Sequence, residues 1–170
     1  MDEHTRQIVE GLKRAMLAES DGHNFYMMAA KNTKDNKGKQ VLTSLAKDEI
    51  DHFNFLKAQY KSFMETGAPD ANIKLRKYKS NTSKSPIFSA DFKKRLKKAH
   101  YEMSALAIGA QLELLSIQFY RGESEKAINP VVKAFYAELA EWETTHHQAL
   151  VRQQELLQDD YFFESRFYPF

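Results

Sequence analysis

The sequence predicts an all-α protein whose main domain is a four-helix bundle. Four long segments carry apolar residues at the spacing of one helix face. Few helix breakers interrupt them, because the 170 residues contain only 6 Gly and 4 Pro. The same segments place six Glu and His residues on their apolar faces, where packing requires hydrophobic side chains. These six positions are the candidates for function.

The first half of the chain predicts two helices. The first is expected from about Glu3 to Thr33, and the turn-forming segment KDNKG at residues 34–38 ends it. The second is expected from about Lys39 to Glu65, before Gly67 and Pro69. In both segments leucines and aromatic residues recur every three or four positions, so each helix presents one apolar face.

Residues 67–89 lack a helical stripe and predict a long crossover between the second and third helices. About 23 residues at roughly 3.3 Å each span about 75 Å, whereas a helix of about 27 residues is about 40 Å long. The connection can therefore run the whole length of the bundle, and the third helix need not be antiparallel to the second. The basic run at 74–84 is interpreted as a solvated loop and not as a nucleic-acid contact.

A third helix is expected over residues 90–120. Ser89 is a suitable N-cap, and Phe88 is placed to pack on the first turns. Gly122 is expected to end this helix.

The fourth helix begins with Asn129 as N-cap and Pro130 at the first helical position, and is expected to continue to about Gln158. The bundle domain thus covers residues 1–158. The remaining segment, 159–170, is an aromatic tail that we expect to pack on the bundle or on a partner. A homodimer is the expected assembly.

Composition narrows the chemistry. Charged residues make up 28% of the chain and the formal net charge is +2, which does not favour nucleic acid as a partner. The absence of Cys excludes disulfides, thiolate nucleophiles and iron–sulfur clusters, so any metal must be held by oxygen and nitrogen. Neither a signal-peptide pattern nor an apolar run of about 18 residues is present. We therefore expect a cytoplasmic protein without a membrane span.

The chain repeats itself at an offset of 94 residues, which indicates two copies of one helical hairpin. Apolar positions match at this offset, and so do the six polar residues and two tyrosines. The matched pairs are Glu19 with Glu113, Tyr26 with Tyr120, Glu49 with Glu143, and His52 with His146.

Each Glu-x-x-His pair lies on one helix face, because residues i and i+3 are neighbours on a helix. Counting from the expected turns places all four carboxylates near the midplane of the bundle. Burying a charge there costs several kcal/mol, and protonated carboxyls would still need partners. Two divalent cations balance four carboxylates, and two neutral imidazoles complete the set. Iron or manganese suits this combination, with zinc at lower preference.

A single Glu on each of two helices, with Glu-x-x-His on the other two, is the di-iron carboxylate arrangement of ferritin-like bundles. The sequence resembles the rubrerythrin branch of that superfamily over about residues 3–158. The matching stretches are AESDGHNFY, LAKDEIDHFNFL, AQLELLSIQFY and LAEWETTHHQAL.

The resemblance implies a ferritin-like fold that binds two iron ions and a role for each residue. Glu19 and Glu113 would be terminal ligands, and Glu49 and Glu143 would bridge both metals. His52 and His146 would each bind one metal. Tyr26 and Tyr120 would hydrogen-bond to ligands and orient them, although core packing is an equally good interpretation of both tyrosines.

The chain departs from the family pattern in two places. Rubrerythrins proper carry a four-cysteine rubredoxin domain as an electron relay, whereas this chain has no Cys and needs an external electron donor. They also carry a further Glu three residues after the third-helix ligand, where this chain has Ser116.

The remaining histidines are not expected to bind metal. His23 corresponds to Ile117 in the repeat and is interpreted as a core histidine with a hydrogen-bond partner. His147 corresponds to Phe53, and His4 and His100 are expected at the surface.

The expected function is that of a di-iron oxidoreductase, peroxidase-like or ferroxidase-like, that reacts with peroxide or dioxygen. No catalytic side chain is indicated beyond the metal centre. One alternative is a non-catalytic protein that stores or delivers iron. Another is an oxygenase with an organic substrate, which a cavity lined by Ala15, Gly22 and Gly109 would favour.

Overall fold

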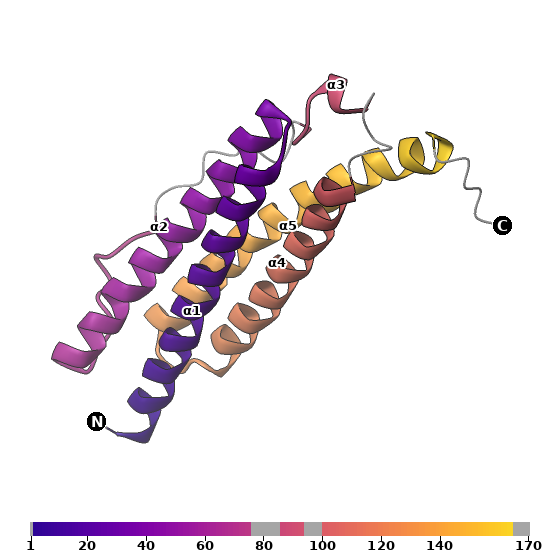
Figure 1. Cartoon of the computed structure of the whole chain (residues 1–170). Helices are drawn as coiled ribbons and strands as arrows, with labels where there is room; N and C mark the ends of the chain where they lie inside the picture. Colours follow the sequence, from indigo (N-terminus) through magenta and orange to yellow (C-terminus); the bar gives the residue numbers. More distant parts are fainter. Residues whose placement is uncertain (1, 76–85, 94–99, 165–170) are drawn as a thin grey trace.

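The computed structural model describes residues 2–75, 86–93 and 100–164, and over these ranges the chain forms helices and no strand (Figure 1). The all-α class is therefore confirmed. None of the described helices is both long and apolar enough to cross a membrane. In chain order the helices are α1 (Glu3–Asn32), α2 (Asn36–Thr66), α3 (Ala90–Lys93), α4 (His100–Lys126) and α5 (Pro130–Glu164).

The long helices begin and end where local chemistry satisfies their free backbone groups. The Asp35 carboxylate accepts a 2.8 Å hydrogen bond from the Gly38 N–H and caps α2. At the other end of α2, Gly67 adopts φ 73°, a left-handed conformation that glycine tolerates best. The Asn129 side chain accepts a 2.9 Å bond from the Val131 N–H and caps α5, as the sequence predicts.

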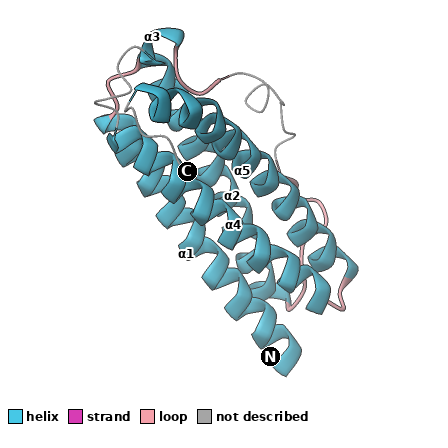
Figure 2. Ribbon diagram, turned by 90° about the vertical axis from the view of Figure 1, so that its right-hand side faces the viewer, coloured by secondary structure: helices cyan, strands magenta, loops and turns pink. Residues whose placement is uncertain are grey.

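The helices pair as two hairpins, α1 with α2 and α4 with α5, and α1 also contacts α4. Figures 1 and 2 show the four long helices aligned along one axis, with α3 at the end away from the N-terminus. Both α2 and α4 run from the α3 end toward the opposite end (Figure 1). The end of α2 and the short helix α3 lie at opposite ends of the bundle (Figure 1), and residues 76–85 between them lie outside the described ranges.

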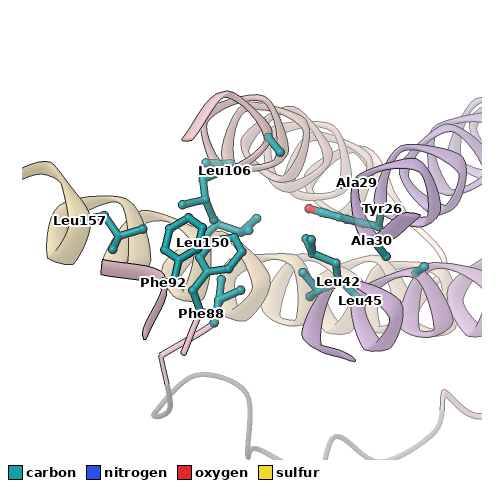
Figure 3. Packing of buried hydrophobic residues seen from close by; sticks show 14 residues of the cluster. Tyr26, Ala29, Ala30, Leu42, Leu45, Phe88, Phe92, Leu106, Leu150 and Leu157 are labelled. Carbon is teal, nitrogen blue, oxygen red and sulfur yellow. The ribbon is translucent and has the colours of Figure 1, made fainter. Parts of the chain in front are cut away.

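Among the residues that the structure describes, the apolar core forms two separate clusters, one toward each end of the bundle. The cluster at the α3 end contains Tyr26 and is drawn in Figure 3. The cluster at the other end contains Leu12, Leu56, Tyr120 and Leu139. In each long helix, one or two buried Glu or His residues lie between the segments that enter the two clusters. The bundle thus has a polar layer between two apolar ones.

The segment before α3 is tied to the bundle by buried polar contacts. The Asp35 carboxylate accepts hydrogen bonds from the Ser89 N–H and hydroxyl, and the side-chain amide oxygen of Gln153 accepts one from the Ile87 N–H. The Phe88 ring stacks on Phe92, 4.3 Å between centroids. The Ser89 hydroxyl therefore donates to Asp35, the residue that caps α2.

Helix boundaries differ from the prediction at the ends of α4 and α5. Of the single helix expected over 90–120, the structure describes α3 and α4, and residues 94–99 between them lie outside the described ranges. The expected end at Gly122 is wrong, because α4 continues to Lys126. One glycine in a helix interior costs only about 1 kcal/mol. The backbone of α5 continues as helix to Glu164, whereas the side chains of the predicted tail at 159–170 lie outside the description.

Two glycines provide a matched test of this packing. A Cβ at Gly38 would overlap the Phe88 ring, whereas a Cβ at Gly122 would have no neighbour within 4 Å. We expect Gly38→Ala to lower the free energy of unfolding by about 1–3 kcal/mol through overpacking. Gly122→Ala should raise it by about 0.5–1 kcal/mol through helix propensity. Urea denaturation measures both, and equal effects would contradict the described contact at Phe88.

Candidate metal centre

The six polar residues singled out in the sequence meet in the layer between the two apolar clusters. Each is at most 4% exposed to solvent. Every long helix contributes: Glu19 from α1, Glu49 and His52 from α2, Glu113 from α4, and Glu143 and His146 from α5.

These side chains form two overlapping groups, each of which can hold a metal ion. One group is Glu19, Glu49, His52 and Glu143, and the other is Glu49, Glu113, Glu143 and His146. Within each group the ligand atoms, one per residue, lie within 4.8 Å of one another. Glu49 and Glu143 belong to both groups, so the two groups lie side by side and share two carboxylates.

Both imidazoles direct Nδ1 at the carboxylates. The His52 Nδ1 atom lies 2.9 Å from Glu143 Oε1 and 3.3 Å from Glu19 Oε2. The His146 Nδ1 atom lies 3.2 Å from Glu143 Oε2 and 3.3 Å from Glu49 Oε1. Glu143 is thus close to both histidines.

Several of these buried atoms lack a hydrogen bond from the described part of the chain. They are Glu19 Oε2, Glu49 Oε1, Glu143 Oε1, both nitrogens of His52 and Nε2 of His146. Buried polar atoms are normally paired, because an unpaired one costs about 1–3 kcal/mol. Close charged groups without aligned hydrogen bonds are the donor set that a cation would complete, so the residues fit a metal ion.

Two of the carboxyl groups hold protons strongly in the metal-free protein. Burial, followed by the charges of Glu143 and Glu19, raises the pKa of Glu49 well above its ordinary value. Burial also raises the pKa of Glu113, and the charges of Glu49 and Glu143 add to this effect. These shifts are the direct cost of collecting carboxylates in a dry layer.

For both histidines and for Glu143, the pKa shifts in the direction opposite to the one that burial alone would cause. Burial lowers the pKa of His52, but Glu143 and Glu19 outweigh it and hold the pKa well above 6.5. For His146, contacts with Asp48, Glu143 and Glu49 likewise outweigh burial and raise the pKa. Burial would raise the pKa of Glu143, yet the two histidines hold it well below 4.5. Without metal, the layer is an ion-paired cluster held together by protons.

The two tyrosines predicted beside the site contact the single carboxylates, each across the α1–α4 boundary. The Tyr26 hydroxyl of α1 donates a hydrogen bond to Glu113 of α4. The Tyr120 hydroxyl of α4 donates one to Glu19 of α1. Burial raises the pKa of both phenols, and their carboxylate partners raise it further, so both remain donors. Each bond fixes the orientation of a carboxylate.

Two neighbours of the histidines were not found from the sequence. Asp48 Oδ2 lies 3.4 Å from the outward nitrogen of His146, Nε2. The Trp142 ring lies edge-on to His52, 5.0 Å between centroids. Asp48 and Trp142 are also 94 residues apart, each directly before a Glu of the site. The position directly before each Glu-x-x-His pair was the sequence signal by which these neighbours could have been found. Because it holds Asp in one hairpin and Trp in the other, the two histidines have different surroundings.

Other sequence predictions fall outside the site. The His23 Nδ1 atom lies 2.7 Å from the Ala46 carbonyl oxygen, so this half-buried histidine has the partner expected for it. His147 is half-buried and belongs to neither group. His100 is exposed as expected, but His4 is half-buried. Ala15 is fully packed in the apolar cluster that contains Leu12.

A family model described as rubrerythrin matches residues 10–154. No curated protein and no solved structure matches the chain. The matched range includes all six Glu and His residues of the polar layer and both tyrosines.

Metal-free protein should become less stable as pH rises. A group whose folded pKa is raised stabilises the fold below its unfolded pKa, and this stabilisation is lost as pH rises through the folded value. The folded pKa is raised above 4.5 for Glu49 and Glu113, and above 6.5 for His52 and His146. The folded pKa of Glu143 is lowered, so the stability that this carboxylate contributes is lost only in acid. We therefore expect a lower melting temperature near pH 8 than near pH 6.

Metal ions would replace these protons, so the gain in melting temperature on adding manganese(II) should be larger near pH 8 than near pH 6. Differential scanning calorimetry with and without the metal measures this gain. A gain that is equal at the two pH values, or larger in acid, would contradict proton–metal exchange in the layer.

Proposed function

The chain belongs to the rubrerythrin family, and from this premise and the geometry of the polar layer we propose that it is a di-iron oxidoreductase. The proposed oxidant is peroxide or dioxygen, and the proposed electron donor is a separate molecule. The observation that carries the proposal is the pair of overlapping four-residue groups that share Glu49 and Glu143.

The overlap of the groups supports a role for each side chain. Glu49 and Glu143 would bridge the two ions, since only they belong to both groups. Glu19 and His52 would complete one site, and Glu113 and His146 would complete the other.

Charge supports two divalent ions at this site. Four carboxylates carry four negative charges when ionised, and two divalent cations balance them without a further counter-ion. Oxygen and imidazole ligands without sulfur suit iron or manganese, with zinc as a weaker alternative. Iron is proposed because the family is a di-iron family and because the expected chemistry needs a metal that changes oxidation state.

When bound, two ferrous ions supply two electrons and a positive charge for an oxygen-containing oxidant. The protein supplies geometry and a dry environment. Tyr26 and Tyr120 hold the single carboxylates by hydrogen bonds. Asp48 faces the outward nitrogen of His146, an arrangement that orients a metal-binding histidine and raises its basicity.

Two sequence features bear on the choice between an oxidoreductase and a protein that stores or delivers iron. The chain has no Cys, so electrons must come from a separate donor. Ser116 stands where rubrerythrins carry a further Glu, so no seventh carboxyl–imidazole ligand is available from that position. Both features are also compatible with a protein that stores or delivers iron, and we retain this as the second candidate.

We also propose that the two hairpins are copies of one ancestral unit joined by a long crossover. The offset of 94 residues supports the repeat. The parallel directions of α2 and α4 support the crossover, because the connection has to reach the opposite end of the bundle.

Removing a bridging carboxylate should abolish the paired site. We expect Glu49→Ala or Glu143→Ala to bind fewer than two ferrous ions per chain and to lose most of the gain in melting temperature on adding iron. Both variants should fold, because neither side chain belongs to the two apolar clusters, which stay intact. Glu141→Ala, an exposed neighbour on α5, is the matched control. Two ions bound to both variants, with unchanged spectra, would refute the bridging roles.

The reaction of the ferrous protein with oxidants distinguishes the proposed oxidoreductase from a protein that stores or delivers iron. In anaerobic stopped-flow mixing, we expect oxidation of both ferrous ions within seconds by hydrogen peroxide or by dioxygen. A chemical reductant should then restore the ferrous state and allow repeated turnover. Absence of reaction with both oxidants would favour storage or delivery of iron over the proposed enzyme.

A further inference from the structure

A cavity of about 300 Å³ lies between α1 and α4 and reaches two carboxylates of the site. Glu49 and Glu113 form its inner end, together with Tyr26. Both carboxylates belong to the metal-binding groups of the polar layer and are at most 4% exposed. The cavity therefore opens onto the polar layer and not onto packed core.

Two small residues create this cavity. Gly22 and Ser116 follow Glu19 and Glu113 by three positions, so each lies one helical turn beyond a carboxylate of the site. A Cβ at Gly22 would already lie 3.4 Å from Glu49 Oε2, and no larger side chain separates that carboxylate from the cavity. Gly109, a further small residue considered from the sequence, instead packs against Tyr26 and Leu150.

The walls of the cavity are mainly apolar. The residues that line it outside the site are Ala18, Leu112, Leu115 and Phe119, with Arg14 and Asp21 also present. The Arg14 guanidinium lies over the Phe119 ring, 5.4 Å from its centroid, and 3.6 Å from Glu123. Leu115 is 52% exposed, which places this wall at the surface. The cavity thus leads from solvent to the carboxylates along an apolar surface.

The size of the cavity exceeds what the simplest oxidants need. A water molecule occupies about 30 Å³ in the liquid, and hydrogen peroxide and dioxygen are each about as large as one or two waters. Sites for small organic molecules begin at about 300 Å³ and combine apolar walls with a few converging polar groups. This cavity has that size and that composition.

We propose that the cavity binds an organic hydroperoxide, with its apolar body against the α1–α4 walls and its –OOH group facing Glu49 and Glu113. This rests on the proposed function, since the hydroperoxide replaces hydrogen peroxide as the oxidant of the same centre. In the reaction the O–O bond breaks. The two electrons would come from the ferrous centre held by the six Glu and His residues, which would be oxidised to the ferric state, and two protons from solvent would complete one alcohol and one water molecule.

Binding and turnover can be tested separately with cumene hydroperoxide and its reduction product, 2-phenylpropan-2-ol. The alcohol has the same apolar body but no O–O bond, so its binding does not depend on redox chemistry. We expect it to raise the melting temperature of the full chain. We also expect a higher kcat/KM for cumene hydroperoxide than for hydrogen peroxide in the iron-loaded protein.

Ala18→Leu adds bulk to a cavity wall at an exposed helix position, so the variant should fold. It should remove the thermal shift caused by the alcohol and lower the ratio of the two kcat/KM values by about tenfold or more. Ala107→Leu, an exposed alanine of α4 that does not line this cavity, is the matched control and should behave as the parent protein.

The outcomes distinguish this inference from the proposed function. Alcohol binding that Ala18→Leu removes, without turnover of either peroxide, supports the cavity and contradicts the proposed enzyme. Turnover of hydrogen peroxide without alcohol binding overturns the cavity inference and leaves the enzyme standing. Alcohol binding that is equal in Ala18→Leu and the parent protein also overturns it.

Discussion

Repulsion among four carboxylates in one dry layer is the constraint on which the arrangement of this bundle depends. Glu19, Glu49, Glu113 and Glu143 are all buried, and water cannot screen them. In the metal-free protein, protons on Glu49 and Glu113 and protonated histidines beside Glu143 relieve the repulsion. Two divalent cations would relieve it more completely. The apolar clusters on both sides of the layer hold the side chains together and exclude water from them.

The two halves of the layer share a pattern but differ in their surroundings. Positions 94 residues apart hold equivalent ligand-type residues, yet Asp48 corresponds to Trp142 and Gly22 to Ser116. One histidine consequently faces a carboxylate and the other an indole edge. We infer that two metals in this layer would differ in affinity and potential, because outer partners tune metal-binding histidines.

Much of the fold and of the site can be predicted from the spacing of apolar and polar residues along the sequence. The long helices are visible as apolar stripes, and the six polar residues stand out because they break those stripes at matched positions. Contacts of residues that break no apolar stripe could not be found in this way. Ser89 bonds to Asp35, and His146 faces Asp48, only because the bundle brings separate helices together. The cavity beside Glu49 depends on the spacing of α1 and α4, although Gly22 already indicated space there.

The central claim is that the buried layer holds two metal ions, and anomalous X-ray scattering tests it most directly. Crystals of the protein loaded with ferrous iron, measured on both sides of the iron absorption edge, locate each iron atom without reference to activity. The account predicts two anomalous peaks per chain, both between Glu49 and Glu143, with His52 beside one and His146 beside the other. An empty layer, or iron bound only at the protein surface, would contradict it.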